Sequence, residues 1–214
     1  MAYSFLYELL APKANYEKLR DGKLLQLAEV PRRYWWDNVQ NHEGLPHYDP
    51  IKRYIDSLPA HNRRGRGLLL YGALGTGKTS LACRVLMDAM ARAPIPAHFQ
   101  SALELDECSK HRQEESASGY PIWDLICGAQ FLVLDDFGTV RTAYHGRLLE
   151  EVIRRRYNNR LVTTITTNLQ LAEIEARYPW FVSIAKQTLE IIEVSGKDWR
   201  EPPDDAVTRL GSLL

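Results

Sequence analysis

A glycine-rich segment from Gly72 to Thr79 carries the clearest chemistry in the sequence. It reads GALGTGKT and matches the pattern G-x-x-x-x-G-K-[ST] at every fixed position, with an apolar run before it and a helical pattern after it. The glycines let the backbone approach a ligand closely and adopt unusual dihedral angles, so that successive amides can point at phosphate oxygens. The segment therefore predicts a phosphate loop for a nucleoside triphosphate.

The polar positions of this loop have separate expected roles. Lys78 would place a point charge on the β- and γ-phosphates, and Thr79 would offer its hydroxyl to Mg²⁺. The positive end of the following helix would help the backbone amides of residues 75–80 to bind phosphate. We expect ATP and Mg²⁺ as ligands, and the expected nucleotide-binding residues are Gly72, Gly75, Thr76, Gly77, Lys78, Thr79 and Ser80.

Two carboxylates follow a second apolar run, FLVLDD at 131–136. Ligands of doubly wound sheets bind at the carboxyl ends of the strands, so these carboxylates would lie near the phosphate loop. This is the Walker B arrangement, in which Asp135 would hold Mg²⁺ through water and Asp136 would polarise the attacking water. The alternative is a pair of solvated loop carboxylates.

A third polar group ends the β-branched run LVTTITTN at 161–168. Asn168 would lie beside the γ-phosphate and could orient water, so the expected catalytic residues are Lys78, Asp136 and Asn168. The alternative role for Asn168 is to cap a helix over 170–177, and both roles can coexist.

Alternating apolar and helical segments predict the scaffold that positions these groups. Strands at 67–72, 97–100, 131–136, 161–168 and 189–194 alternate with helices at 78–92, 102–116, 121–128, 144–158 and 170–177, after a helix at 48–58 and a basic surface turn at 61–67. This order predicts an α/β fold with a five-stranded parallel sheet and helices on both faces.

The spacing of the motifs narrows the class of fold. The stretch between Thr79 and Asp135 is long enough for a helix, a strand and more helix. That length indicates a P-loop NTPase of the additional-strand type, with the strand of the catalytic carboxylate inserted beside the phosphate-loop strand. A compact nucleotide kinase would also show an arginine-rich lid, which we do not find.

Bulk composition limits the partners and the compartment. The 214 residues carry 27 basic and 27 acidic side chains, so any nucleic-acid site must be a local patch rather than a property of the whole charge. Three widely spaced cysteines indicate a reducing compartment and no zinc site. No signal peptide and no apolar run long enough to span a membrane are evident, so we expect a cytoplasmic protein.

The motifs together resemble the DnaC/IstB group of AAA+ ATPases, which are bacterial and phage helicase loaders and transposition helper ATPases. The resemblance covers about residues 31–200, and the pieces that carry it are PRRYWWDNV (31–39), LLLYGALGTGKTSLA (68–82), FLVLDDFG (131–138), LLEEVIRRRYNNRLVTTITTNL (148–169) and, more weakly, IIEVSGKDWR (191–200). It implies the same phosphate, Mg²⁺ and catalytic residues, with Asn168 as sensor 1 and no separate helical lid domain.

One departure from the group concerns hydrolysis across subunits. The group usually carries an arginine shortly before the last core strand, which reaches a neighbouring subunit's γ-phosphate, but residues 180–187 contain none. We therefore expect slow turnover by the isolated protein. Substitutes could be Lys186, Arg177, Arg154, Arg155 or Arg156, and the alternative for the three consecutive arginines is a solvated helix surface.

The resemblance implies a role and a division of the chain. We expect a helical segment or partner-binding arm at 1–30, the ATPase core at 31–200 and a tail at 201–214. The leading hypothesis is a helicase loader in DNA replication that assembles on single-stranded DNA and a replicative helicase, with ATP-dependent self-association. Candidate DNA contacts are Lys110, His111, Arg112, Arg141 and Arg147, and each could equally be solvated surface charge.

Three alternatives stay open. An IstB-like transposition helper would assemble on double-stranded DNA, an adaptor would bind ATP without hydrolysing it, and a small-molecule kinase is the most distant. Trp35 and Trp36 could border the adenine, although paired aromatics before a core more often serve packing.

Overall fold

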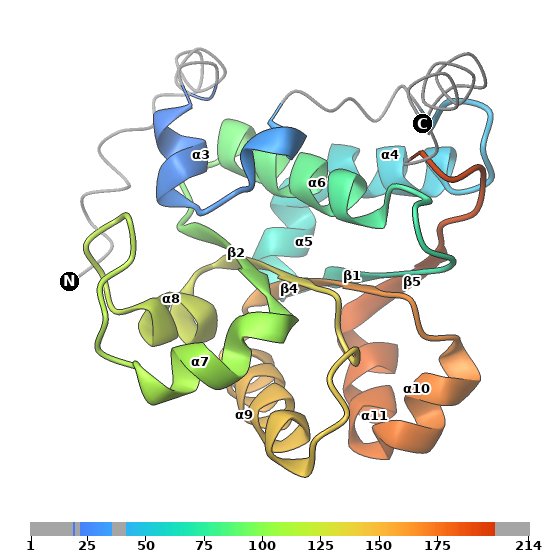
Figure 1. The fold of residues 1–214 in the computed structure, drawn as a ribbon. Coiled ribbons are helices and arrows are strands. Elements are labelled where there is room, and N and C mark those ends of the chain that lie inside the picture. The colour runs from blue at the N-terminus through green and yellow to red at the C-terminus, as the bar shows by residue number, and fades with distance from the viewer. Residues whose placement is uncertain (1–18, 20–21, 36–41, 200–214) are drawn as a thin grey trace, which may run out of the picture.

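One parallel sheet organises the molecule. The structure, a computed structural model, describes Leu19 and residues 22–35 and 42–199. Its strands lie in the order β2-β3-β4-β1-β5 (Figure 1). The bounds are Gly67–Tyr71 for β1, Ala97–Ser101 for β2, Phe131–Asp135 for β3, Val162–Thr167 for β4 and Leu189–Glu193 for β5. All the pairings are parallel, which confirms the predicted five-stranded α/β fold.

Helices cover both faces of the sheet, as Figure 1 shows. On one face lie α3 (Lys23–Leu27), α4 (Tyr48–Asp56), α5 (Leu58–Arg64) and α6 (Lys78–Arg92). On the other face lie α7 (Leu105–Lys110), α8 (Ile122–Gly128), α9 (Ala143–Asn158), α10 (Leu171–Arg177) and α11 (Pro179–Thr188). Two short 3-10 turns, η1 (Arg32–Tyr34) and η3 (Ala102–Glu104), complete the elements of the part of the chain that the structure describes. No described helix is long and apolar enough to cross a membrane.

Each central strand supplies apolar side chains to two separate cores. In β1, Leu68 and Leu70 pack with the α6 side, whereas Leu69 packs with the α9 and α11 side. In β3, Val133 packs with the α6 side and Leu132 with the α9 and α11 side. Successive strand residues point to opposite faces, and here both faces are covered. This double burial explains why the strands read as continuous apolar runs.

The order of the central strands differs from the sequence-based expectation. The acidic strand β3 is not beside β1, because β4 lies between them and Ile165 pairs with Leu69 on one side and Leu134 on the other. Every residue of β4 is buried. A short β-branched segment suits this central position, where both faces and both edges are occupied. The inserted strand therefore carries Asn168, not the catalytic carboxylates.

Two local segments also differ from expectation. The basic stretch predicted as a turn at 61–67 continues α5 to Arg64, because Pro59 lies in its first turn and Gly65 ends it in the left-handed conformation. The helix predicted over 102–116 ends at Lys110, and a turn with an isolated bridge between Glu115 and Pro121 follows.

A buried arginine joins α9 to the sheet. The Arg156 side chain is 0% exposed, and its guanidinium donates hydrogen bonds to the carbonyls of Ile126 and Val162 at 3.0 and 2.7 Å and to Thr163 Oγ1 at 2.9 Å. The suggestion that Arg156 acts on a neighbouring subunit is therefore wrong, because its guanidinium group is buried and forms its hydrogen bonds within the fold. The adjacent Arg155 is exposed.

This contrast gives a stability prediction. We expect Arg156→Met to lower the free energy of unfolding by about 3 kcal/mol, because three buried acceptors lose their donor. The matched variant Arg155→Met should change it by less than about 0.5 kcal/mol. Urea denaturation followed by circular dichroism measures both, and equal effects of the two variants would contradict the assigned role.

Candidate nucleotide site

The phosphate loop, the acidic strand end and Asn168 meet at one pocket. The pocket has a volume of about 290 Å³ and lies at the carboxyl edge of the sheet. Its lining residues come from the segment before the core, the loop, two strand ends and the last described residues: Arg33, Tyr34, His42, Gly75, Gly77, Lys78, Thr79, Ser80, Asp136, Asn168 and Trp199. Most of the residues that the fold brings together here were therefore predicted from the sequence.

The phosphate loop has the backbone that its glycines allow. Gly72, Gly75 and Gly77 have φ angles of 144°, 76° and 91°, which residues with a Cβ rarely adopt. The hydroxyl of Thr76 donates to the Ala73 carbonyl at 3.0 Å and closes the turn. Helix α6 begins directly afterwards, so its N-terminal amides face the pocket. The loop is thus shaped to bind phosphate oxygens.

The Lys78 ammonium group is already drawn into the loop. The side chain is only 5% exposed, and Nζ donates to the carbonyls of Gly72, at 3.0 Å, and Ala73. These carbonyls hold the positive charge in a partly desolvated position. A triphosphate entering the loop could replace them as the partner of the ammonium group.

The hydroxyl of Thr166 connects the two carboxylates. It donates to Asp135 Oδ1 and accepts a hydrogen bond from the backbone N–H of Asp136 at 3.0 Å. Because Thr166 lies in β4, the inserted strand fixes both Asp135, at the end of β3, and Asp136, which follows it. The role of Thr166 was not predicted from the sequence, where the polar end of the TTN run was the only signal for it.

Asp135 is suited to hold a cation. Burial raises the pKa of Asp135 above its ordinary value, and the charge of Asp136 adds to this rise. Hydrogen bonds from Thr166 and Thr79 and the charge of Lys78 lower the pKa of Asp135. The hydroxyl of Thr79 and the carboxylate of Asp135 are hard oxygen ligands of the kind that Mg²⁺ prefers. These two side chains therefore fit the expected ion.

Asp136 and Asn168 form the far wall of the pocket. Asp136 has a positive φ of 58°, an uncommon conformation for a non-glycine residue, and Asn168 Nδ2 donates to its Oδ1 at 3.5 Å. Helix α10 is capped by Gln170, whose N–H donates to Glu173 Oε2 at 2.9 Å. The alternative role of Asn168 as the cap of this helix is therefore wrong, and its amide faces the pocket.

A short strap formed by residues 197–199 crosses the phosphate loop. The N–H of Trp199 donates to the Gly75 carbonyl at 2.9 Å, and a Cβ placed on Gly75 would lie 1.7 Å from Oδ1 of Asp198. Lys197 Nζ lies 4.5 Å from the centroid of the Trp199 ring. No signal in the sequence predicted this contact. The strap therefore places the Asp198 carboxylate directly against the backbone of the phosphate loop.

His42 covers the same side of the phosphate loop. Its ring lies 5.5 Å from that of Trp199 and covers Gly77, and its Nδ1 is 2.9 Å from Nε2 of His47. Burial, together with His42, lowers the pKa of His47 to about 4. His47 is therefore uncharged near neutral pH.

The aromatic lining differs from the pair considered from the sequence. Trp35 Nε1 donates to the Val30 carbonyl at 2.7 Å and its ring packs against Gly22, so the structure favours the packing role. Trp36 lies outside the described residues. Tyr34 and Trp199 line the pocket instead.

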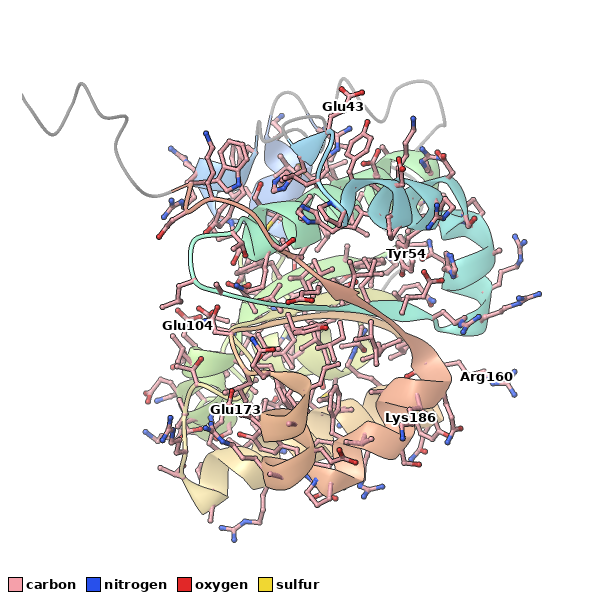
Figure 2. The ribbon with its side chains drawn as sticks, turned by 90° about the vertical axis from the view of Figure 1, so that its right-hand side faces the viewer. Glu43, Tyr54, Glu104, Arg160, Glu173 and Lys186 are labelled. Carbon is pink, nitrogen blue, oxygen red and sulfur yellow. The ribbon has the colours of Figure 1, made fainter. Side chains whose placement is uncertain are left out.

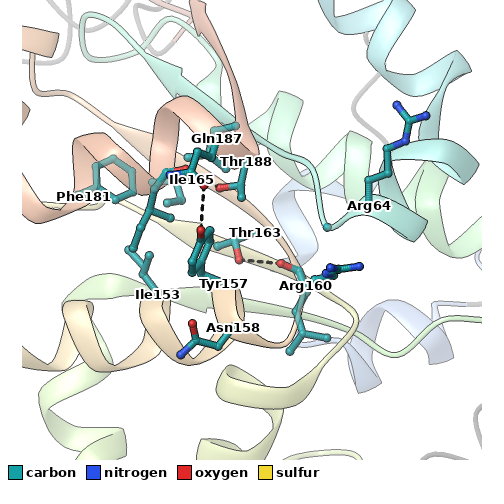
Figure 3. Close-up of a pocket in the computed structure, with 14 residues that line it drawn as sticks. Arg64, Ile153, Tyr157, Asn158, Arg160, Thr163, Ile165, Phe181, Gln187 and Thr188 are labelled. Atoms are coloured by element: carbon teal, nitrogen blue, oxygen red, sulfur yellow. Dashed lines mark hydrogen bonds between the residues drawn. The ribbon is translucent and has the colours of Figure 1, made fainter.

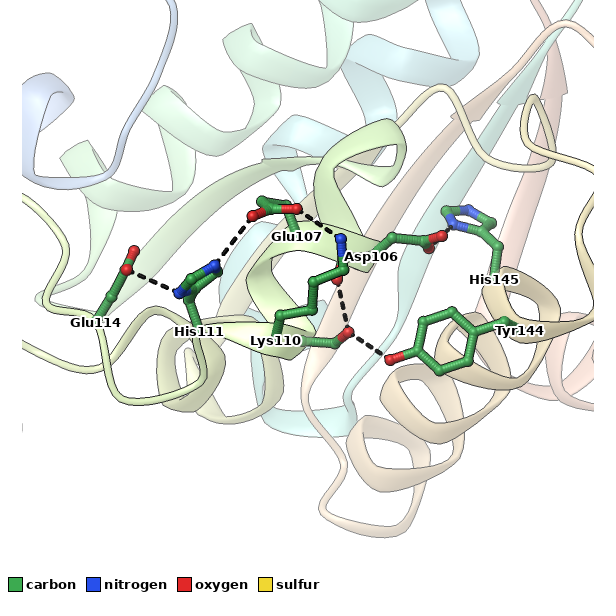
Figure 4. Close-up of polar contacts among 8 residues, drawn as sticks. Asp106, Glu107, Lys110, His111, Glu114, Tyr144 and His145 are labelled. Carbon is green, nitrogen blue, oxygen red and sulfur yellow. Dashed lines mark hydrogen bonds and ion pairs between the residues drawn. The ribbon is translucent and has the colours of Figure 1, made fainter.

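The candidate DNA contacts fall into two groups. Lys110 pairs with Glu107 at 2.9 Å, and His111 lies between Glu107 and Glu114, as Figure 4 shows. Arg112 is held more firmly, because it makes two hydrogen bonds of 3.1 Å to the Glu151 carboxylate and lies over the Trp123 ring. Arg141 and Arg147, by contrast, are exposed near the acidic strand end. Of the residues considered for contact across subunits, Arg155 and Lys186 are exposed but do not line the pocket.

The sheet order, the phosphate loop and the acidic strand end define a P-loop protein of the AAA+ class with an additional central strand. The sequence model of the family described as IstB-like ATP binding protein matches residues 40–184, so the chain belongs to that family. No characterised protein sequence matches the chain significantly.

Solved structures share the fold. The crystal structure of the DnaC helicase loader is 24% identical with a TM-score of 0.67, and the match covers 77% of this chain and 100% of that one. The structure of DnaI is 20% identical with a TM-score of 0.65, over 80% and 94% of the two chains. AMPPCP-bound DnaA from Aquifex aeolicus is 15% identical with a TM-score of 0.57, over 85% and 60%.

The strap gives a prediction for nucleotide affinity. We expect Asp198→Asn to tighten ATP binding about fivefold, because it removes a negative charge beside the phosphate loop. Asp56→Asn makes the same charge change on α4, where Asp56 pairs with Arg92, and should leave the affinity unchanged. Titration of a fluorescent ATP analogue measures both. An Asp198→Asn variant that binds ATP equally or more weakly would contradict a repulsive role for this carboxylate.

Proposed function

We propose that this protein is an ATP-dependent helicase loader in DNA replication, which assembles on single-stranded DNA with a replicative helicase. The observation that carries the ATP-driven part is the meeting of Lys78, Thr79, Asp135, Asp136 and Asn168 at one edge of the sheet. The loader part is supported by the likeness to the DnaC helicase loader.

The residues of the pocket divide the work of ATP hydrolysis. The loop amides and Lys78 bind the phosphates, and Thr79 and Asp135 would hold Mg²⁺, which supplies positive charge to the phosphate oxygens when bound. Asp136 accepts a proton from, or polarises, the attacking water, and Asn168 orients that water through its amide. Arg155 and Lys186 remain candidates for contact with a neighbouring subunit, as do Arg154 and Arg177, which would have to leave Glu150 and Glu173. Turnover by the isolated protein is slow.

The DNA side of the proposal rests on Arg141 and Arg147. Both are exposed and follow the acidic strand end, so bound DNA would lie near the loop that carries Asp136. Lys110 and Arg112 could join only by leaving Glu107 and Glu151. Residues 1–30 are proposed as the arm that binds the helicase. The structure describes Leu19 and residues 22–30 of this segment, and their apolar side chains Leu24, Leu25 and Val30 pack in the core.

Two other functions have an observation in their favour. The family description favours an IstB-like transposition helper, which would assemble on duplex DNA. The burial of Arg156 removes one candidate for hydrolysis across subunits and favours a non-hydrolysing adaptor that ATP switches.

Two variants separate binding from hydrolysis. We expect Lys78→Ala to weaken ATP binding roughly 100-fold, because the phosphates lose a charged donor. Asp136→Asn should bind ATP within a few-fold of the wild type but lower the turnover rate roughly 100-fold, since the group that polarises water is lost. Equilibrium binding and phosphate release measure the two quantities. Unchanged affinity of the Lys78→Ala variant would refute the assigned phosphate loop.

The function itself is tested by light scattering and phosphate release with ATP–Mg²⁺. We expect assembly and faster turnover with single-stranded oligonucleotides, and a further increase when a replicative helicase is added. Assembly on duplex alone would replace the loader by the transposition helper. A monomer that binds ATP without turnover under all these conditions would replace it by the adaptor.

A further inference from the structure

Cations at the amino ends of the strands lack the acidic partners found elsewhere. Several arginines elsewhere pair with a carboxylate, namely Arg84 with Asp88, Arg112 with Glu151, Arg154 with Glu150 and Arg177 with Glu173, whereas other surface arginines such as Arg53 and Arg155 have no such pair among the described residues. Arg63, Arg64, Arg66 and Arg160 have no carboxylate within 4.0 Å among the described residues. We call these four residues the amino-edge patch. Figure 2 shows Arg160 and Lys186 at the side of the molecule opposite Glu104 and Glu173.

Two interlocked turns hold the patch in place. Gly65 ends α5 with a φ of 66°, and Arg160 begins the connection to β4 with a φ of 52°. A Cβ on Gly65 would lie 2.6 Å from the Arg160 carbonyl oxygen, so the two turns touch backbone to backbone. A positive φ is costly for arginine, by about 1 kcal/mol, and persists only where the surroundings fix it. The turn therefore presents Arg160 beside Arg64 in a defined position.

A hollow of about 350 Å³ opens at the patch. Arg64 and Arg160 lie at one end of it, and Ile153 and Phe181 lie at the other (Figure 3). Between these ends the Tyr157 hydroxyl donates to Gln187 Oε1 at 2.9 Å, and the side chains of Asn158 and Thr188 also line the wall. The hollow thus combines positive charge, hydrogen-bonding groups and an aromatic ring.

The pKa of the neighbouring His61 also reflects the positive charge of the patch. Burial lowers the pKa of His61, and the charges of Arg66 and Arg64 lower it further, against the opposing effect of Glu190. Glu190 is the carboxylate that faces this histidine, at 3.7 Å. Because the whole chain is neutral, this local excess of arginine is a feature of one surface.

We propose that the amino-edge patch binds the phosphate backbone of single-stranded nucleic acid. All four cations are arginines, whose planar guanidinium groups match phosphate oxygens in pairs, whereas a lysine offers only a point charge. Tyr157 is 36% exposed and supplies a ring on which an unpaired base can stack. The patch lies at the opposite edge of the sheet from the phosphate loop, so this binding goes beyond the proposed ATP-coupled contact and does not require nucleotide.

The test compares two double variants of equal charge change. In Arg64→Ala/Arg160→Ala the patch loses two unpaired cations, and in the control Arg92→Ala/Arg154→Ala the surface loses two cations that pair with Asp56 and Glu150. Fluorescence anisotropy with a labelled oligothymidine, without nucleotide and at several salt concentrations, gives the affinity and its salt dependence. We expect the patch variant to bind roughly tenfold more weakly, with a salt slope smaller by about 1 to 2, and the control to match the wild type.

Several outcomes would overturn the inference. These are equal affinities of the wild type and the patch variant, no binding of the oligonucleotide by the wild type, an equal loss in the control, or a loss confined to duplex DNA. Tighter binding of polyglutamate than of oligothymidine would assign the patch to an acidic protein instead. Unchanged thermal unfolding and ATP affinity of the patch variant show that it is folded.

The proposed function can fail separately from this inference. ATP-driven assembly is measured with the helicase and with Arg141→Ala/Arg147→Ala, neither of which alters the amino edge. Loss of assembly with intact patch binding would remove only the loader proposal, and loss of patch binding with intact assembly would remove only the second nucleic-acid surface.

Discussion

Parallel hydrogen bonding along both edges of β4 fixes the phosphate-loop strand, the acidic strand end and Asn168 relative to one another. The strand pairs with β1, which leads into the phosphate loop, and with β3, which ends in the two carboxylates. The Thr166 hydroxyl then bonds Asp135 and the Asp136 amide directly. A shift of β4 by one residue would turn its side chains to the opposite face and separate these groups. The chemistry at the edge thus depends on the register in the interior.

Charged side chains are held differently at the two edges of the sheet. At the carboxyl edge, charges are desolvated and held by short contacts, as with Lys78 on the loop carbonyls and Asp135 on Thr166. At the amino edge, Arg63, Arg64 and Arg160 are exposed and have no carboxylate within 4.0 Å among the described residues. Buried charges need compensation within the fold, whereas exposed ones remain available to outside partners. The molecule therefore separates the proposed nucleotide-binding groups from the amino-edge patch, which is the second surface proposed to bind nucleic acid.

The phosphate loop, the acidic strand end and the parallel sheet were predictable because their signals are local and periodic. The burial of Arg156 was not predicted, although the residue lies on the same helical face as the buried Val152 and Ile153. The contact of Trp199 with Gly75 was not predictable, because nothing in either segment specifies the other. The order of β3 and β4 likewise depends on packing between elements distant in sequence. Pairing of Arg112 with Glu151 could not be foreseen for the same reason.

The threonines of β4 have a consequence for how variation in this protein is read. Thr163, Thr164, Thr166 and Thr167 are all buried, and valine has nearly the same shape as threonine. A valine at 166 would fill the same space and suit a strand, yet it could neither donate to Asp135 nor accept from the Asp136 amide. A laboratory library selected only for yield and heat resistance would accumulate such a change unnoticed. Screens for soluble variants would then enrich proteins whose folded scaffold has lost its link to the acidic residues.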